Sequence, residues 1–240
     1  YNGLSEINQS GEWCLNSDTG EIYFYPPSDI EKGDAIVSIN TRPLIEIRNA
    51  SKIRIENIVF ENSRKEGITV YNGDGIIIEK CTFRNLGGWA IRETSTKNSN
   101  ISDCEIYNVG EGGIYIEGGS RKTLTPGNNQ IVNNHIHDFS LWIRIYRPAI
   151  QINGVGNRAA NNLIHNAPHM AIGWAGNENI IEFNEIHSVV LETNDAGAIY
   201  SGRDPSMQGN IIRYNYFHDI GRITGHGVAS VYFDDGHCGN

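Results

Sequence analysis

The sequence contains few cysteines, little basic charge and no long apolar run. Its four cysteines (Cys14, Cys81, Cys104 and Cys238) are too scattered for a disulfide framework, and no CxxC pair indicates a zinc or redox motif. No apolar run approaches the roughly 18 residues that a membrane helix requires, so we expect no membrane partner. Lys and Arg number 19 against 28 Asp and Glu, giving a net charge of −9. Because wrapping nucleic acid requires a basic surface, we expect no nucleic-acid partner.

Leucine is also scarce, and this shortage indicates the type of secondary structure. The chain has 35 Ile against 8 Leu, together with 28 Asn and 27 Gly. Ile suits a pleated sheet, whereas Asn and Gly tolerate the positive φ values of turns. No stretch of 10 residues shows helical periodicity. We therefore expect many short strands joined by tight turns.

A short pattern recurs seven times from Ile55 onward, of the form I-x-x-[N/C/I]-x-[I/F]-x-[N/D/S]. One copy begins with Ala159 instead of Ile. Equivalent positions are separated by 22 to 31 residues, and each copy is followed by a second alternating apolar run. About 22 residues can trace one turn of a solenoid with three short strands, and the longer intervals indicate loops inserted into a turn. The equivalent positions are Ile58, Cys81, Cys104, Asn134, Asn162, Asn184 and Asn215.

This repeat predicts an all-β fold, a right-handed parallel β-helix of about seven coils. Stacked coils place equivalent residues about 4.8 Å apart, so inward Ile columns bury one another and inward turn Asn side chains form hydrogen-bonded ladders. The shortage of Leu excludes a leucine-rich repeat, and a propeller blade needs about 40 residues or more. A β-sandwich remains an alternative, but it does not explain the register of the columns.

The two ends of the chain differ from the repeat. Residues 12–15 and 21–25 flank a turn and are typical of a hairpin that ends at Pro26 and Pro27. We assign residues 1–43 to this hairpin, which would cap the solenoid, and residues 44–240 to the β-helix. The sequence stops just after a strand, with nothing to cover the last coil. We therefore expect the natural protein to continue beyond Asn240, or a partner subunit to cover this end.

Three insertions, at residues 139–148, 189–197 and 220–229, join the first strand type to the second. A fourth, at residues 118–127, falls on another corner. Because equivalent corners stack, the three loops are expected to wall a groove, and loops on a rigid scaffold usually carry function.

Acidic residues concentrate around that groove. Asp195 precedes one strand, and Asp234 and Asp235 follow the next, so carboxylates from neighbouring coils are expected to converge. Paired acids suit glycosidic-bond cleavage. We name Asp195 and Asp235 as the catalytic pair, with Asp234 and Glu192 as substitutes. The alternative is that these acids only form turns and that Arg203 and Asp204 form a surface ion pair.

Other side chains near the groove are candidates for substrate binding. By alternation Tyr200 and Tyr232 point outward on consecutive coils, where their rings can stack on sugars, whereas Trp174 points into the core. The remaining candidates are Arg147 and His169, which share one position before their strands, and Arg203 and Asp204.

Four histidines form one column, at His137, His165, His187 and His218. One histidine per coil gives no compact tetrahedral site, so we favour a stacked polar ladder and predict no metal site. Cys81 and Cys104 are within plausible reach of a disulfide. We favour the interpretation that they are small buried residues in place of Asn.

Several strings resemble bacterial right-handed β-helix proteins of glycoside hydrolase family 141. The most specific are ETNDAGAIYSGRD (residues 192–204) and YFDD (residues 232–235), with YRPAI (residues 146–150), GVGN (residues 154–157) and IHNAPH (residues 164–169) in support. The resemblance covers nearly the whole chain. It implies action on xylan or on fucosides of plant cell-wall polysaccharide, with Asp195 and either Asp234 or Asp235 as catalytic carboxylates.

Our leading hypothesis is therefore a glycoside hydrolase of the xylanase or α-L-fucosidase type, acting on a plant-type polysaccharide without a cofactor. The alternatives are a polysaccharide lyase or epimerase acting on uronates, with Arg147 and Arg203 neutralising the sugar carboxylate, and a non-catalytic carbohydrate-binding solenoid. The expected substrate implies an extracellular or periplasmic location. The oligomeric state is open.

Overall fold

The computed structural model describes residues 3–33, 35–221 and 227–237. Its contacts divide the chain into two units, Tyr1–Val37 and Ser38–Asn240. In the described part of the chain no helix has the length and apolarity needed to cross a bilayer.

The first unit contains the predicted hairpin. Strands β1 (Trp13–Leu15) and β2 (Ile22–Phe24) pair in antiparallel register, and short 3₁₀ helices lie on either side, η1 (Leu4–Glu6) and η2 (Ile30–Lys32). The Asn16 side chain accepts hydrogen bonds from the amides of Asp18 and Thr19, which fixes the turn. The capping role of this unit stays a prediction.

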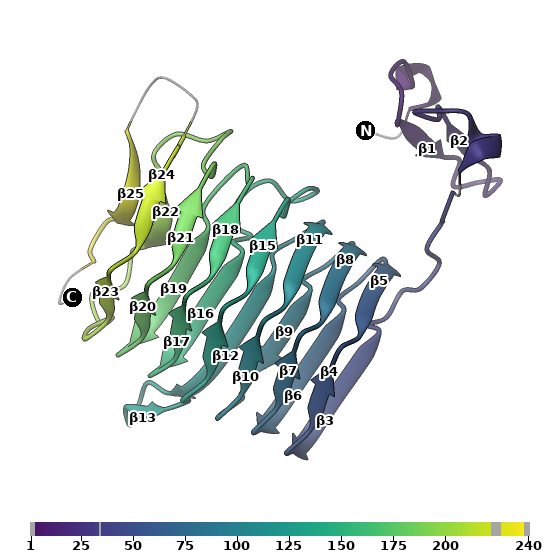
Figure 1. The fold of residues 1–240 in the computed structure, drawn as a ribbon. Helices are drawn as coiled ribbons and strands as arrows, with labels where there is room; N and C mark the ends of the chain where they lie inside the picture. Colours follow the sequence, from purple (N-terminus) through teal and green to yellow (C-terminus); the bar gives the residue numbers. More distant parts are fainter. Residues whose placement is uncertain (1–2, 34, 222–226, 238–240) are drawn as a thin grey trace. The chain divides into compact units, whose positions relative to one another are not determined.

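The second unit confirms the predicted parallel β-helix (Figure 1). Each coil contributes one strand to each of three parallel sheets. The first sheet contains β4 (Arg54–Glu56), β7 (Ile77–Glu79), β10 (Asn100–Ser102), β14 (Gln130–Val132), β17 (Arg158–Ala160), β20 (Ile180–Glu182) and β23 (Ile211–Arg213). The second sheet contains β5 (Val59–Ser63), β8 (Thr82–Leu86), β11 (Glu105–Val109), β15 (His135–His137), β18 (Leu163–His165), β21 (Glu185–His187) and β24 (Tyr216–His218).

The third sheet contains the second strand type of the repeat. Its strands are β3 (Ile45–Ser51), β6 (Ile68–Asp74), β9 (Ile91–Thr94), β12 (Ile114–Ser120), β16 (Ile150–Val155), β19 (Ile172–Asn177), β22 (Ala196–Ser201) and β25 (Val228–Phe233). A short strand, β13 (Thr125–Pro126), lies in the insertion of residues 118–127 and pairs with β12.

Identical residues stack in register in the core, as the repeat predicts. In the first sheet, Ile55 pairs with Ile78, Ile78 with Ile101, and Ile101 with Ile131. These side chains are at most 8% exposed and belong to one continuous apolar cluster. Trp174 is also buried in this cluster, as alternation predicts.

The predicted asparagine ladder joins the corners between the first and second sheets. The side-chain oxygen of Asn162 accepts the backbone N–H of Asn134 at 3.0 Å, and that of Asn184 accepts the N–H of Asn162 at 3.0 Å. A second ladder, which we did not predict, follows another corner through Asn129, Asn157, Asn179 and Asn210. Both ladders satisfy backbone groups that the corners would otherwise bury without partners.

Three of the predicted insertions join the second sheet to the third, after β15, β21 and β24. Residues 222–226 of the last insertion lie outside the described part of the chain. Cys81 and Cys104 are buried free thiols, as we favoured, and each donates a hydrogen bond to a backbone carbonyl at 3.3 Å. Cys238 lies outside the described residues.

Candidate functional site

Two tyrosines on neighbouring coils lie at the centre of the candidate site. Tyr200 on β22 pairs in register with Tyr232 on β25, and both point away from the core as predicted. Their ring centroids are 5.9 Å apart in an edge-to-face arrangement. The site therefore lies on the outer face of the third sheet.

Each tyrosine donates a hydrogen bond to a predicted catalytic acid. The Tyr200 hydroxyl lies 2.5 Å from Oδ2 of Asp234, and the Tyr232 hydroxyl lies 2.7 Å from Oδ1 of Asp195. Asp195 precedes β22 and Asp234 follows β25, so the two tyrosines connect carboxylates that come from opposite ends of their strands. In the described part of the chain, Asp195 and Asp235 share no hydrogen bond.

Two glycines, one in β22 and one directly after it, allow the last coil to lie close to β22. A Cβ at Gly197 would lie 2.6 Å from Cβ of Tyr232, and a Cβ at Gly202 would lie 2.5 Å from Cβ of Asp234. Any larger residue would push the last coil away. Because these two glycines have no side chain, Tyr232 and Asp234 can pack directly against the backbone of β22 and of the residue after it.

Asp234 and Asp235 have different surroundings. The Asp234 side chain is 16% exposed and lies 3.6 Å from Nε of Arg203, while its Oδ1 accepts the amide of Asp235 at 2.8 Å. The Asp235 side chain is exposed, and among the described residues its carboxylate accepts no hydrogen bond. Its backbone carbonyl instead accepts the amide of Arg203.

These contacts change the proton affinities of the site. The Tyr200 hydroxyl, followed by the Asp235 amide, lowers the pKa of Asp234, so this carboxylate is ionised at neutral pH. Burial, with the Asp234 charge, raises the pKa of Tyr200. The hydrogen bond to Asp195 raises the pKa of Tyr232 to about 12. Both tyrosines are therefore neutral donors.

A pocket of about 150 Å³ opens beside Tyr200. Tyr146 and Tyr200 line it, with their rings 6.3 Å apart, and Gln151 and Gly173 belong to its lining as well. Gly173 stands beside Gln151 and Tyr200 in the neighbouring coils, so the missing side chain leaves room for the pocket.

Three other predicted residues lie on two of the insertion loops and on the segment before β19. Glu192 forms an ion pair with Arg144, which lowers the pKa of Glu192. Arg147 forms an ion pair with Glu111 at 2.6 Å. His169 is only 6% exposed, and burial lowers its pKa to about 4, so it is neutral.

Asp204 follows β22 at the same edge of the third sheet as Asp234, but its carboxylate has other partners. Its carboxylate binds Ser206 and lies 2.8 Å from Arg121 of the fourth insertion, so it forms no ion pair with Arg203. Ser206, followed by Arg121, lowers the pKa of Asp204 to about 2. Arg121, Lys122 and Asn177 line a separate open hollow of about 610 Å³.

The histidine column stacks on the outer face of the second sheet as predicted. The ring centroids of His137 and His165 are 5.0 Å apart, and those of His165 and His187 are 4.7 Å apart. Burial lowers the pKa of His165 and of the neighbouring His135. Two sets of side chains have the spacing of metal ligands, Glu105 with His135 and His137, and Glu185 with His187 and His218.

Sequence reasoning missed Gln151, Gly173, Arg144 and His135 as parts of these sites. Gly173 could have been found from the sequence, because it is a glycine at an outward position where the neighbouring strands carry the larger residues Gln151 and Tyr200. Arg144 and Glu192 belong to two different loops, so no local pattern links them.

Comparison with protein families agrees with this geometry. Residues 5–143, more than half of the chain, match the family model described as right handed beta helix region. The chain belongs to the right-handed β-helix family. A search of curated proteins gives no match.

Among solved structures, this β-helix protein is similar to an alginate lyase from Paenibacillus sp. str. FPU-7. The two share 14% sequence identity with a TM-score of 0.32, and the alignment covers 79% of this chain and 94% of the lyase chain. A similarity this remote carries no argument about substrate or reaction.

Proposed function

We propose that this protein is a glycoside hydrolase that binds a polysaccharide across the outer face of the third sheet. The observation that carries the proposal is the pair of tyrosine–aspartate hydrogen bonds, Tyr200 with Asp234 and Tyr232 with Asp195, beside a pocket with aromatic walls. Glycosidic-bond cleavage requires two carboxylates that flank the scissile bond, and neighbouring coils supply them here.

The contacts favour Asp234 over Asp235 as the partner of Asp195. The ionised Asp234 suits the role of nucleophile or base, and Asp195, which accepts the hydrogen bond of Tyr232, is the second carboxylate of the pair. The neutral Tyr200 hydroxyl orients Asp234 by a 2.5 Å hydrogen bond. Carboxyl groups about 5 Å apart in the enzyme–substrate complex would retain anomeric configuration, and a separation of about 6.5 to 9.5 Å would invert it.

The walls of the site suit a sugar that carries little charge. Tyr146 and Tyr200 offer ring faces for the C–H surfaces of a sugar, and Gln151 offers an amide for its hydroxyl groups. The net charge of −9 disfavours a polyanion. The resemblance to glycoside hydrolase family 141 supports xylan or a fucosylated plant glycan, and such a substrate supports an extracellular or periplasmic location.

A uronate lyase or epimerase is the second candidate. It is favoured by Arg203, which is 73% exposed beside Asp234 and could neutralise a sugar carboxylate. Arg147 already pairs with Glu111, so it is less available for that role.

The test is an activity screen of the full chain on xylan, fucosylated glycans and uronate polymers. We expect new reducing ends without the ultraviolet absorbance of unsaturated products. Asp195→Asn should abolish turnover but leave binding of the glycan intact, because only a catalytic carboxylate is lost. The matched control is Glu192→Gln, in the same loop, which should keep parental turnover. Unsaturated products would identify a lyase, and binding with no turnover on any glycan would identify a binding module.

A further inference from the structure

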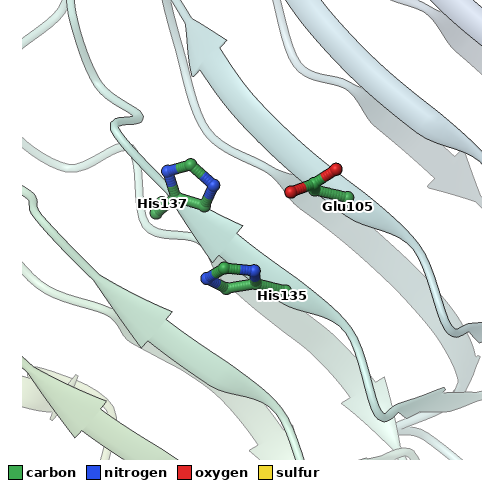
Figure 2. A group of neighbouring side chains, drawn as sticks. All are labelled: Glu105, His135 and His137. Carbon is green, nitrogen blue, oxygen red and sulfur yellow. The ribbon is translucent and has the colours of Figure 1, made fainter.

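We propose that Glu105, His135 and His137, on the outer face of the second sheet, form a binding site for a divalent transition-metal ion. The side chains come from two neighbouring strands, β11 and β15, which pair in parallel register with Glu105 opposite His135 (Figure 2). One ligand atom from each residue lies within 4.8 Å of the other two. Small side-chain rotations would bring all three to one ion.

The hydrogen bond of His137 prepares this ring for metal binding. Its Nδ1 lies 2.7 Å from Oδ2 of Asp138, which holds a proton on Nδ1 and leaves the lone pair of Nε2 available. Metal-binding histidines in proteins usually donate their second N–H to a carboxylate in this way. The structure thus contains both the ligand and its orienting partner.

His165 supplies a fourth ligand from the next strand, β18. Its Nε2 lies 2.8 Å from Nε2 of His135, and its ring stacks on that of His137 at 5.0 Å. With zinc–nitrogen bonds of about 2.0–2.1 Å, two imidazole nitrogens on one ion lie about 3 Å apart, so little movement is needed. A bound ion would take the place of the hydrogen bond between the two rings.

The donor set selects the class of metal. Imidazole nitrogens with one carboxylate suit Zn²⁺ and its neighbours, whereas Ca²⁺ and Mg²⁺ prefer oxygen ligands only. The sequence prediction of no metal site was based on one histidine per coil and missed this set, because His135 belongs to the neighbouring column and shares a coil with His137. An ion here would tie adjacent coils together.

The other histidine set is less suitable. Both ring nitrogens of His218 face carboxylates, with Nδ1 at 2.9 Å from Asp219 and Nε2 at 3.4 Å from Glu185. Such an arrangement favours a doubly protonated ring, which has no lone pair for a metal. We therefore assign the site to the set around His135.

The experiment is calorimetric titration of the metal-free full chain with Zn²⁺, at a pH above the ordinary imidazole pKa of about 6.5. We expect micromolar or tighter binding, lost by at least about tenfold in His135→Gln and in His137→Gln, which corresponds to about 1.4 kcal/mol of binding free energy. Glu105→Gln, at an exposed position, tests the site without removing a ring from the stack. The matched control His218→Gln should bind as the parent does.

Replacement of Zn²⁺ by Co²⁺ adds a spectroscopic measurement. Visible absorption bands of imidazole-bound Co²⁺ should appear in the parent and disappear in His135→Gln, while thermal unfolding without metal shows that the variant folds. Absence of micromolar binding by the parent would overturn the proposal. Binding that is lost in His218→Gln but kept in His135→Gln would overturn it as well.

Discussion

Gly173 determines whether the pocket beside Tyr200 exists. A Cβ at this position would lie 2.4 Å from Oε1 of Gln151 and 3.3 Å from Sδ of Met170. Both atoms belong to flexible side chains, so the fold can accommodate a larger residue while the pocket cannot stay open.

We predict that Gly173→Val weakens substrate binding without unfolding the protein. KM should rise by about tenfold or more with a smaller change in kcat, because the lost contacts are made in the ground state as well. Ala175→Val, two residues along β19 and outside the pocket lining, is the control. An unchanged KM in Gly173→Val would show that the substrate does not use the pocket.

Glu93 is a buried acidic residue that makes the stability of the protein depend on pH. It is fully buried on β9, and in the described part of the chain neither carboxylate oxygen has a hydrogen-bond partner. Burial raises the pKa of Glu93 to about 7. The folded protein therefore keeps this carboxyl neutral at pH values where the unfolded chain ionises it.

We predict that Glu93→Gln stabilises the protein at pH 8 but has little effect near pH 4. Between the unfolded pKa of about 4.5 and the folded value of about 7, the folded state binds more protons, so the free energy of unfolding falls as pH rises, by about 3 kcal/mol in total. Gln does not ionise, so the variant should lack this loss. Urea unfolding at several pH values measures it, with the exposed Glu178→Gln as control. Parallel pH profiles for Glu93→Gln and the parent would contradict the prediction.

For single residues, alternation along a strand predicts the outward positions of Tyr200 and Tyr232 and the inward position of Trp174. It does not predict which acid each tyrosine contacts. The contact of Asp195 with Tyr232 depends on how the long loop before β22 turns back, which no periodic pattern encodes.

At the scale of single elements, the asparagine ladders hold the corners of successive coils together. Asn162 accepts the amide of Asn134 and donates to the carbonyl of Ile131, both at 3.0 Å. These groups are buried, so they have no access to water in place of the ladder.

We predict that Asn162→Ala destabilises the protein by about 2–4 kcal/mol, because two buried backbone groups lose their partners. The neighbouring Asn161 is exposed at a positive φ of 55°, and Asn161→Gly should change stability by less than about 1 kcal/mol. Chemical denaturation of both variants measures the difference. Equal stabilities would show that the ladder contributes little.

The sequence repeat predicts the strands and one ladder well because every coil repeats the same local interactions. The insertion loops have no such repetition. Arg144 and Glu192 pair across two loops, and the sequence offers no signal for that pairing. The ladder through Asn129 and Asn157 has the same spacing as the predicted ladder, and it escaped prediction because its asparagines lie just before the repeat pattern, which begins at Ile131 and Ala159 in these coils.

At the scale of the whole molecule, the solenoid brings residues far apart in the sequence onto one face. Tyr146, Tyr200 and Tyr232 come from three coils, and only the stacking of coils places them together. Stacking also separates the two proposed sites, since the tyrosine pairs lie on the third sheet and His135 lies on the second. Loss of metal binding in His135→Gln and loss of turnover in Asp195→Asn are therefore independent results.

We propose that the solenoid presents Asp234, held by Tyr200, as a catalytic carboxylate. The most direct measurement compares kcat for the parent, Asp234→Asn and the adjacent, exposed Asp235→Asn on the glycan that the parent cleaves. We expect kcat to fall about a thousandfold in Asp234→Asn, with glycan binding retained, and to stay within a few-fold of the parent in Asp235→Asn. Parental turnover in Asp234→Asn, together with its loss in Asp235→Asn, would show that Asp235 and not Asp234 is the catalytic carboxylate.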